Sequence, residues 1–472
     1  MNRYRLTAKI LLTVFIFSSL SVEAGQNDGG PGQAEISSPE GGKPAGEEGL
    51  TLPMAVQLAL QNSPRVKATL SGREMMDAQV RESKARIWPL LQFSETFTRS
   101  TNPVFVFGSL LEQSRFAPQN FEINSLNNPD PINNFRTALN LKWSIFDQMQ
   151  TSSQIAQAKI GQEQADLQKE MVKQQIRFEV IRAYYGVLLA RQRKEVTEEA
   201  VSMAESDRKR IADRLNTGLV VQSDLLSAEV QLAEFQQQQV QAAGDLVTAQ
   251  AFLNTALGVP IQTSQNISGH LAEKHFPLAE SDDLIRQALQ SRPDYARAGS
   301  SIRSTEEGVR GAKGNYLPRV DVFSTYGMSG RDLSSGSSDY AVGAGLTFNV
   351  FDLSRNGRLD KARAAQSAAA AEQEHLARQI QMEVIHAYQE YLSARGRMQV
   401  AAQIVAQAEE ALRIVQDRYR EGLTTITEVL RAETAFLRTR LNLVSSRYDY
   451  YIGYARVLIT IGKLTDVTPF AS

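Results

Sequence analysis

The sequence contains no cysteine among its 472 residues. A disulfide framework is therefore excluded, and so is a lipid anchor on an N-terminal cysteine. Charge of one sign is not in excess either, because 51 basic residues stand against 52 acidic ones. A net charge of −1 leaves no basic footprint that would indicate binding to nucleic acid.

Long apolar runs are also missing, since no stretch of roughly 18 apolar residues follows the N-terminal segment. Helical membrane spans are therefore not expected, and any insertion into a membrane has to use strands. The four histidines (His270, His275, His375 and His386) lack metal-ligand spacing, and His386 is best explained by packing or lumen lining. No G-x-x-x-x-G-K-[ST] motif and no nucleophile–base–acid set is present. We therefore expect no enzymatic activity, no metal and no cofactor.

The N-terminus has the pattern of a processing signal. Basic residues precede the apolar run Ile10–Phe17, and small residues lead up to Gly25. This pattern predicts a secretory signal peptide over residues 1–24, with a short amphipathic anchor as the alternative. The Gly-, Pro-, Glu- and Ser-rich residues 25–49 predict a flexible leader.

The rest of the chain is a duplication. Ala59–Pro64 recurs as Ala288–Pro293, and Phe146-Asp147 recurs as Phe351-Asp352 at a smaller offset. The change in offset places an insertion in the first copy, between its two expected strands. A duplication of this length predicts two equivalent repeats. The predicted segments are a first repeat at 50–258, a connector at 259–277, a second repeat at 278–464 and a tail at 465–472.

Each repeat contains two segments in which apolar and polar residues alternate. The predicted strands span about 90–98 and 137–146 in the first repeat, and about 319–327 and 340–351 in the second. Segments of about ten residues with this period have the length of membrane strands. A half-buried sheet of a soluble protein is the alternative. The secretion signal and the helix-rich remainder favour the membrane.

Long helices follow each strand pair. Residues 150–216 contain no proline, and a helix of that length would extend about 100 Å. Residues 356–420 form a similar stretch. Because no globular core can bury such helices, they must pack against one another. Gly218 and Gly422 are the expected helix stops, which predicts long antiparallel hairpins over residues 150–258 and 355–463.

Four strands cannot close a barrel, and an open sheet edge in lipid would leave backbone groups without hydrogen bonds. The strands must therefore be pooled between identical chains. Long hairpins that continue from such a ring would enclose water. The sequence thus predicts a conduit.

Two turn motifs connect the chain to a known family. The segments Arg214–Leu226 and Arg418–Leu430 occupy matched places in the duplication, and the chain resembles the TolC family of outer-membrane efflux proteins over about residues 50–464. The resemblance implies a mainly α fold with membrane β-strands. A trimeric α-helical coiled-coil barrel would be fused to a twelve-stranded β-barrel with four strands from each chain. It also implies the outer membrane of a Gram-negative bacterium, with the helical tunnel in the periplasm.

The same resemblance implies partners and sites. The expected partners are two further copies of the chain, a periplasmic membrane-fusion adaptor, an inner-membrane pump and outer-membrane lipid. The expected gate residues are Asp224, Tyr419, Glu428 and Arg431. The expected adaptor-docking residues at the tips are Gly218, Leu219, Val220, Gly422, Leu423 and Thr424.

Each of these sites has a plainer interpretation. An apolar residue beside a turn glycine often makes only a local contact, and Asp224 and Glu428 lie where acids favour the helix dipole. Two positions also depart from the family pattern. Thr424 replaces a gate-locking arginine of some relatives, and Arg431 replaces an acid while lying within pairing distance of Glu428 on one helix face.

The leading hypothesis is a passive duct that exports small molecules as the exit component of a tripartite efflux system. A second hypothesis keeps the duct and makes the cargo a secreted polypeptide, as in type I secretion. A third, from another class, is a coiled-coil surface or scaffold protein without a lumen, which needs no lipid-facing strand face. The sequence does not identify the exported substrate.

Overall fold

The computed structural model describes residues 49–470. The predicted signal peptide and the leader up to residue 48 lie outside this range. The helices before the first long hairpin and in the connector region are α2 (Leu52–Asn62), α3 (Pro64–Ala85), α4 (Pro103–Glu112), η1 (Pro118–Phe121), α5 (Ile123–Asn127), α8 (Ser281–Ser291) and α9 (Pro293–Gly314). The long hairpins consist of α6 (Gln150–Asn216), α7 (Gln222–Leu257), α10 (Ser354–Arg420) and α11 (Ile426–Thr460), and η2 (Thr468–Phe470) follows them. In this part of the chain, none of the helices combines the length and the apolar character that a membrane crossing requires.

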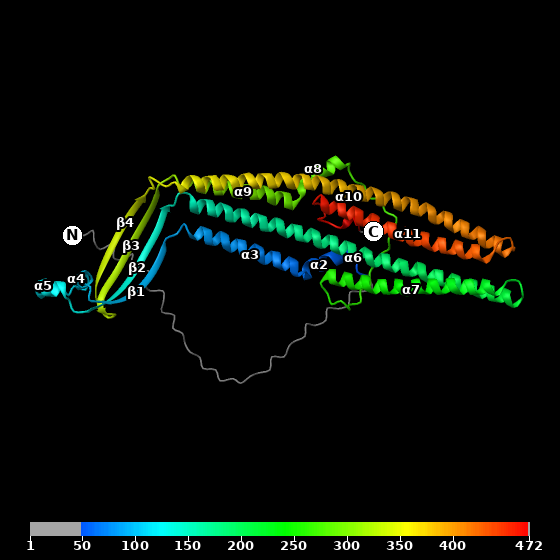
Figure 1. Cartoon of the computed structure of the whole chain (residues 1–472), viewed down its shortest axis with the longest axis horizontal. Helices are drawn as coiled ribbons and strands as arrows, with labels where there is room; N and C mark the ends of the chain where they lie inside the picture. The colour runs from blue at the N-terminus through cyan, green and yellow to red at the C-terminus, as the bar shows by residue number, and fades with distance from the viewer. Residues whose placement is uncertain (1–48, 471–472) are drawn as a thin grey trace, which may run out of the picture. The chain divides into compact units, whose positions relative to one another are not determined.

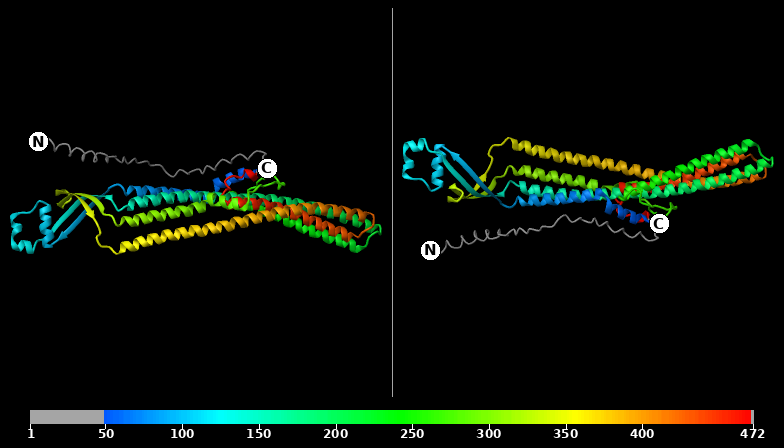
Figure 2. Two further views of the ribbon diagram at one scale, coloured as in Figure 1. Left: turned by 90° about the horizontal axis from the view of Figure 1, so that it is seen from above. Right: turned by 90° about the horizontal axis from the view of Figure 1, so that it is seen from below.

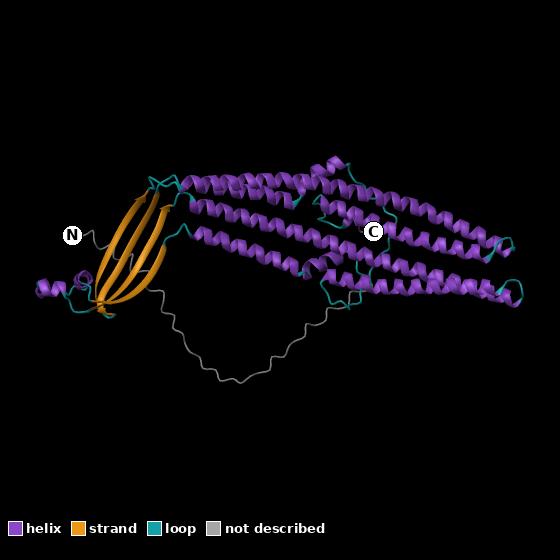
Figure 3. Ribbon diagram, viewed as in Figure 1, coloured by secondary structure: helices purple, strands orange, loops and turns teal. Residues whose placement is uncertain are grey.

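One antiparallel sheet lies at one end of the helices (Figures 1 and 3). Its strands are β1 (Leu90–Ser100), β2 (Ile132–Phe146), β3 (Arg319–Asp332) and β4 (Ser335–Thr347). They pair in the order β1-β2-β3-β4, so the central pair joins the two repeats and β1 and β4 have free outer edges.

The register assigns opposite characters to the two faces of the sheet. Leu139 pairs with Phe93 on one side and Tyr326 on the other, whereas its neighbour Asn140 pairs with Gln92 and Thr325. The large apolar residues that share the face of Leu139 and are exposed are Leu91, Phe93, Phe97, Trp143, Tyr326, Tyr340, Val342 and Leu346. The opposite face carries polar groups, with the Thr325 hydroxyl donating to Asn140 Oδ1 at 3.0 Å. An exposed apolar face backed by a polar face is typical of a membrane strand.

Phe323 interrupts the alternation of β3 because it lies on the polar face. Its ring lies directly against Gly343 of β4, in the space that a Cβ atom would occupy. Glu95 is the opposite exception, an acid on the apolar face, and there the Thr137 hydroxyl of β2 donates to its carboxylate.

The strand ends differ from the sequence prediction because pairing, and not hydrophobicity, sets them. β2 begins at Ile132 instead of 137 and β3 continues to Asp332 instead of 327, through polar residues whose backbone is paired. β4 begins at Ser335 and ends at Thr347 instead of 351, because Thr347 pairs with Arg319, the first residue of β3. The expected insertion between the two strands of the first repeat contains three helical segments (α4, η1 and α5), which its prolines had concealed.

The helices α6 and α10 are both 67 residues long, and each packs along its own returning helix, α7 or α11. Glycines with positive φ end the returning helices, namely Gly258 (φ 69°) after α7 and Gly462 (φ 73°) after α11. Gly258 lies against Asn62, and Gly462 lies against the backbone of Ser291 and Arg292. Each returning helix therefore ends against the break between two short helices. A Cβ atom at either glycine would collide with that break.

The main core draws on both repeats. Phe276 of the connector stacks on Tyr454 of α11 at a centroid distance of 4.4 Å and also contacts Phe470. The Tyr391 hydroxyl of α10 donates to the Phe276 carbonyl. The two repeats are therefore not independent domains, since the described residues of both form one compact unit. Figure 2 shows the two hairpins ending at the same side of the molecule, away from the sheet.

An ion pair lies at each helix break, and the two repeats form it with different arginines. Glu179 of α6 and Glu383 of α10 are equivalent by sequence. Glu179 accepts from Arg65 at 3.0 Å, whereas Glu383 accepts from Arg292 at 2.6 Å. Arg292 also bonds to Asp294, so its guanidinium joins the helix break to α10.

Candidate functional site: the hairpin tips

The two hairpin turns have the same backbone geometry. At the end of α6, Leu219 N–H donates to the Arg214 carbonyl at 2.9 Å, and Gly218 N–H donates to that of Leu215. At the end of α10, Leu423 N–H donates to the Arg418 carbonyl at 2.8 Å in the same way. These bonds define Schellman motifs, in which the C′ residue has a left-handed conformation. Gly218 (φ 75°) and Gly422 (φ 73°) meet that requirement.

The residue after each turn glycine is exposed. Leu219 is 74% exposed and Leu423 is 68% exposed, so each turn presents a large apolar side chain at its surface. Val220 is turned inward and packs against the tip core, and Thr424 is half-buried. Among the six predicted docking residues, the two leucines therefore form the apolar part of the exposed tip surface.

A small core, separate from the main one, joins the tips of the two hairpins. It consists of Ile211, Ala228, Ile426, Val429 and Leu430, with Tyr419 and Val220 packed at its margin. Because it contains residues from α6, α7 and α11, the two tips are held together within one chain.

The acidic residues predicted at the gate are engaged locally. Asp224 accepts from Val221 N–H at 3.4 Å, which is half of a capping box because Val221 has no side-chain acceptor. Arg431 Nη1 donates to Glu428 Oε1 at 2.9 Å, so the pair expected from their spacing is formed. Both side chains are exposed, and such a pair contributes little stability. It does cancel the charge that Glu428 would present at the tip.

Tyr419 is oriented into its own chain. The guanidinium of Arg214 lies 4.8 Å from its ring centroid, a cation–π arrangement that links α6 to α10. The hydroxyl is buried and has no hydrogen-bond partner among the described residues. It borders a cavity of about 40 Å³ between the two hairpins, which is also lined by Arg210 and Gln416. A hydrogen bond from Tyr419 to another copy would require the ring to leave this position.

Two buried acids near the tips were not predicted. Glu433 of α11 is 2% exposed, and neither carboxylate oxygen has a hydrogen-bond partner among the described residues. Burial raises the pKa of Glu433 to about 7, against smaller lowering effects of Gln416 and Arg210. Asp207 of α6 is 4% exposed and is paired with Arg210. The equivalent of Glu433 in the first repeat, Glu229, is exposed, so the sequence repeat could not reveal the burial.

The raised pKa of Glu433 predicts a tip that is less stable at high pH. The folded tip accommodates the protonated carboxyl of Glu433. The stability of the tip is therefore greatest below the ordinary pKa of about 4.5 and is lost as the pH rises toward 7. Glu433→Gln is expected to increase amide-exchange protection of residues 426–437 by about tenfold at pH 8 and little at pH 5. Exchange rates corrected for intrinsic pH dependence measure this effect. Glu229→Gln is the matched control, and equal protection of the two variants at pH 8 would contradict the assignment.

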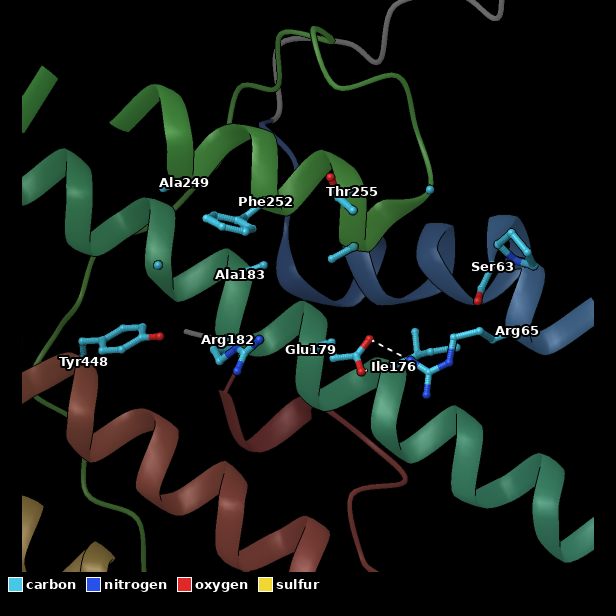
Figure 4. Close-up of a pocket in the computed structure, with 14 residues that line it drawn as sticks. Ser63, Arg65, Ile176, Glu179, Arg182, Ala183, Ala249, Phe252, Thr255 and Tyr448 are labelled. Carbon is cyan, nitrogen blue, oxygen red and sulfur yellow. Dashed lines mark hydrogen bonds and ion pairs between the residues drawn. The ribbon is translucent and has the colours of Figure 1, made fainter. Parts of the chain in front are cut away.

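A larger cavity lies at the first helix break. It has a volume of about 570 Å³ and is lined by residues of α3, α6, α7 and α11 (Figure 4). Arg65 and Glu179 pair at one end of it, and Phe252 and Tyr448 lie toward the other. The lining is mainly apolar, and Phe252 is 67% exposed. Across the described residues, no group of His, Asp and Glu is arranged to hold a metal ion.

Comparisons with known proteins agree with this architecture. The chain is 28% identical to protein CyaE of Bordetella pertussis over 320 residues, which is 66% of this chain and 67% of the relative. It is 21% identical to the outer membrane protein TolC of Escherichia coli K12 over 429 residues, 87% of this chain and 82% of the relative. The crystal structure of the CmeC outer membrane channel of Campylobacter jejuni superimposes with a TM-score of 0.72 at 18% identity, covering 88% of this chain and 86% of that one.

A known protein family matches most of the chain. The model of the outer membrane efflux protein family matches residues 55–259 and 284–462, one segment in each repeat. The predicted family and the predicted fold class, mainly α with membrane β-strands in a duplicated unit, are thereby confirmed. The chain belongs to the family of outer membrane efflux proteins.

Proposed function

We propose that three copies of this chain form a passive duct that exports small molecules as the exit component of a tripartite efflux system. The family is one of outer-membrane ducts and not of enzymes, and it places the chain in the outer membrane of a Gram-negative bacterium, with the helices in the periplasm. The observation that carries the trimer is the four-stranded sheet with an exposed apolar face and two free edges. In lipid, β1 of one copy must pair with β4 of the next.

The helices have matching free edges. Contacts within the chain place α6, α9 and α11 in the middle of the helical layer, with α3 and α7 at one edge and α10 at the other. Both edges expose large apolar residues, namely Leu70, Met75, Leu226, Val230, Val240, Val247 and Phe252 on the first and Met382, Ile385, Leu392, Val400, Ile404 and Ile414 on the second. Two different apolar edges that contact each other form a heterologous interface, which gives a ring when the rotation between copies closes. The scaffold hypothesis explains neither these edges nor the apolar strand face.

The number of copies follows from the lumen. Two copies would supply eight strands, and a barrel of that size is filled by its own side chains. Three copies supply twelve strands, which leave room for a lumen lined by the polar face that contains Asn140 and Thr325. Three is therefore the smallest ring that can conduct.

The tips are the proposed contact with the rest of the export system. Leu219 and Leu423 extend from the two turns of each chain, so a trimer would present six exposed leucines at the periplasmic end. We infer that they dock against a periplasmic adaptor, which joins the duct to an inner-membrane pump. Small apolar contacts that repeat around a threefold axis suit a partner that repeats its own binding site around the same axis.

The test of this function starts with purified protein in mild detergent. Mass measurement of the intact particle should give three copies, and reconstitution into planar bilayers should give ion-conducting channels. A single copy without conductance would refute the duct. Uptake of dyes and of an unfolded polypeptide from the tip side of vesicles then separates small-molecule efflux from polypeptide secretion, because only the second requires passage of a chain.

The gate assignment makes a separate prediction. We expect Asp224→Ala combined with Tyr419→Phe to raise single-channel conductance by about twofold or more, because the proposed hydrogen bonds between neighbouring copies could no longer form. Single-channel recordings in planar bilayers measure the change. Ser227→Ala, an exposed change one turn after Asp224, is the control. Unchanged conductance in the double variant would remove both residues from the gate.

A further inference from the structure

The insertion between β1 and β2 is a folded element. Residues 103–131 contain α4, η1 and α5 and lie at the end of the sheet that is remote from the long helices (Figure 1). Phe116 contacts Phe107 at 4.9 Å and Phe121 at 5.0 Å, both edge-to-face, which ties the helical segments together. The Asn102 side chain caps α4 by accepting from Phe105 N–H at 3.1 Å. The second repeat has only a tight turn at Leu333–Ser334 in the same place.

Polar contacts hold the end of α4 on one face of the sheet. Gln113 is 6% exposed, and its amide nitrogen donates to Asn134 Oδ1 at 2.9 Å and to the Gly330 carbonyl at 3.3 Å. Glu112 lies 3.6 Å from the guanidinium of Arg136 and 3.2 Å from the Ser329 hydroxyl. Arg136 in turn binds Asp339 of β4 at 2.9 Å. The insertion is therefore fastened to β2, β3 and β4 together.

The face to which it is fastened is the polar one. Asn134 and Arg136 alternate with Phe135, which contacts Phe97 on the apolar face at a centroid distance of 4.7 Å. In the proposed duct the apolar face contacts lipid, so the polar face lines the lumen. The insertion must then fold over the lumen at the outer mouth and not out over the membrane.

The exposed surface of the insertion includes large apolar side chains. Val104 is 82% exposed, Ile123 is 78% exposed and Phe121 is 66% exposed. A lipid partner is disfavoured because the polar anchoring holds the insertion on the lumen side of the sheet. The next copy of the insertion is the partner that fits, since β1, from which it starts, is the strand that meets the neighbouring chain. Large apolar side chains around a shared axis would bury one another.

We propose, on the basis of the trimeric duct proposed above, that three copies of residues 103–131 meet over the lumen and form a second constriction at the outer mouth. Glu112 and Gln113 hold each copy on the polar face of its own sheet through hydrogen bonds and an ion pair. Ile123 and Phe121 contact the neighbouring copy. Export is then controlled at two ends, by the tips in the periplasm and by this cap at the exterior.

The lack of cysteine in the chain allows a direct test by crosslinking. Ile123→Cys should give crosslinked dimers of the chain with a short bismaleimide, in intact cells and in detergent. Leu333→Cys is the matched control, because Leu333 is 64% exposed at the same end of the sheet but lies outside the insertion. Crosslinking of Leu333→Cys alone, or of neither variant in a particle of three copies, would overturn the constriction.

A second measurement uses conductance. Replacing residues 103–131 by the tight turn of the second repeat, and separately Glu112→Ala with Gln113→Ala, should raise single-channel conductance by about twofold or more. Both changes are made in the wild-type tip and in the Asp224→Ala, Tyr419→Phe tip, so that a closed tip cannot hide the effect. Trimers that conduct with unchanged amplitude in both backgrounds would overturn the constriction alone. Absence of trimers and of channels in the unaltered protein would instead overturn the duct on which it rests.

Discussion

Leu139→Lys is expected to prevent most of the protein from assembling in the outer membrane, whereas Asn140→Lys is not. Leu139 is at the middle of β2, on the apolar face between Phe93 and Tyr326. A lysine at the midplane of the lipid-facing side costs about 2–4 kcal/mol per chain. This corresponds to a roughly 30- to 1000-fold loss in the equilibrium constant for insertion.

Asn140 is the matched control because it differs only in the face it occupies. The natural Lys142 lies two residues further on the same face, so a lysine there is already tolerated. Heat-modifiable trimer recovered from outer membranes measures assembly of the two variants. Equal assembly of Leu139→Lys and Asn140→Lys would show that the face assignment, and with it the direction of the outer insertion, is wrong.

Arg292→Ala is expected to destabilise the helical region by roughly 3 kcal/mol. The Arg292 side chain is 13% exposed and bonds to Glu383 and Asp294, both at 2.6 Å, and to the Thr460 carbonyl at 3.0 Å. Removal of the guanidinium leaves the carboxylates of Asp294 and Glu383 close to the Thr460 carbonyl with no positive charge between them. Arg65→Ala, in the first repeat, should cost less than about 1 kcal/mol, because Arg65 is 53% exposed.

Urea unfolding of the trimer in detergent, followed by helical circular dichroism, compares the two variants. The difference should depend on pH. Burial alone would raise the pKa of Asp294, but the hydrogen bonds from Arg292 outweigh it and lower that pKa. The stabilisation is therefore present above the ordinary pKa of the acid and is lost as pH falls through its lowered folded value. Variants that unfold at the same urea concentration at neutral pH would contradict the role of Arg292.

Much of the architecture could be predicted from local signals. The proline-free stretches predicted α6 and α10, and the turn glycines predicted both tips, because helix length and a left-handed stop depend on nearby residues alone. The pair Glu428–Arg431 followed from spacing on one helix face. The gate and docking roles of the tip residues stay predictions, since they concern contacts between copies and with an adaptor.

Other features depended on contacts between distant parts of the chain. The end of β4 is set by its pairing with β3, and the position of Phe323 depends on Gly343 across the sheet. Glu229 and Glu433 occupy equivalent places in the duplication and each follows an alanine, yet only Glu433 is buried. No pattern within either helix could distinguish them, because the neighbouring helices decide the burial.

The sequence by itself determined the duplication, the long hairpins and the shortage of strands that requires several copies, since periodicity and helix stops are properties of adjacent residues. Only the tertiary structure decided that Tyr419 turns into its own chain and that the outer insertion rests on the polar face of the sheet. These outcomes depend on which side chains meet across the fold. These contacts between distant residues are set by packing and strand register, which a short stretch of sequence does not determine alone.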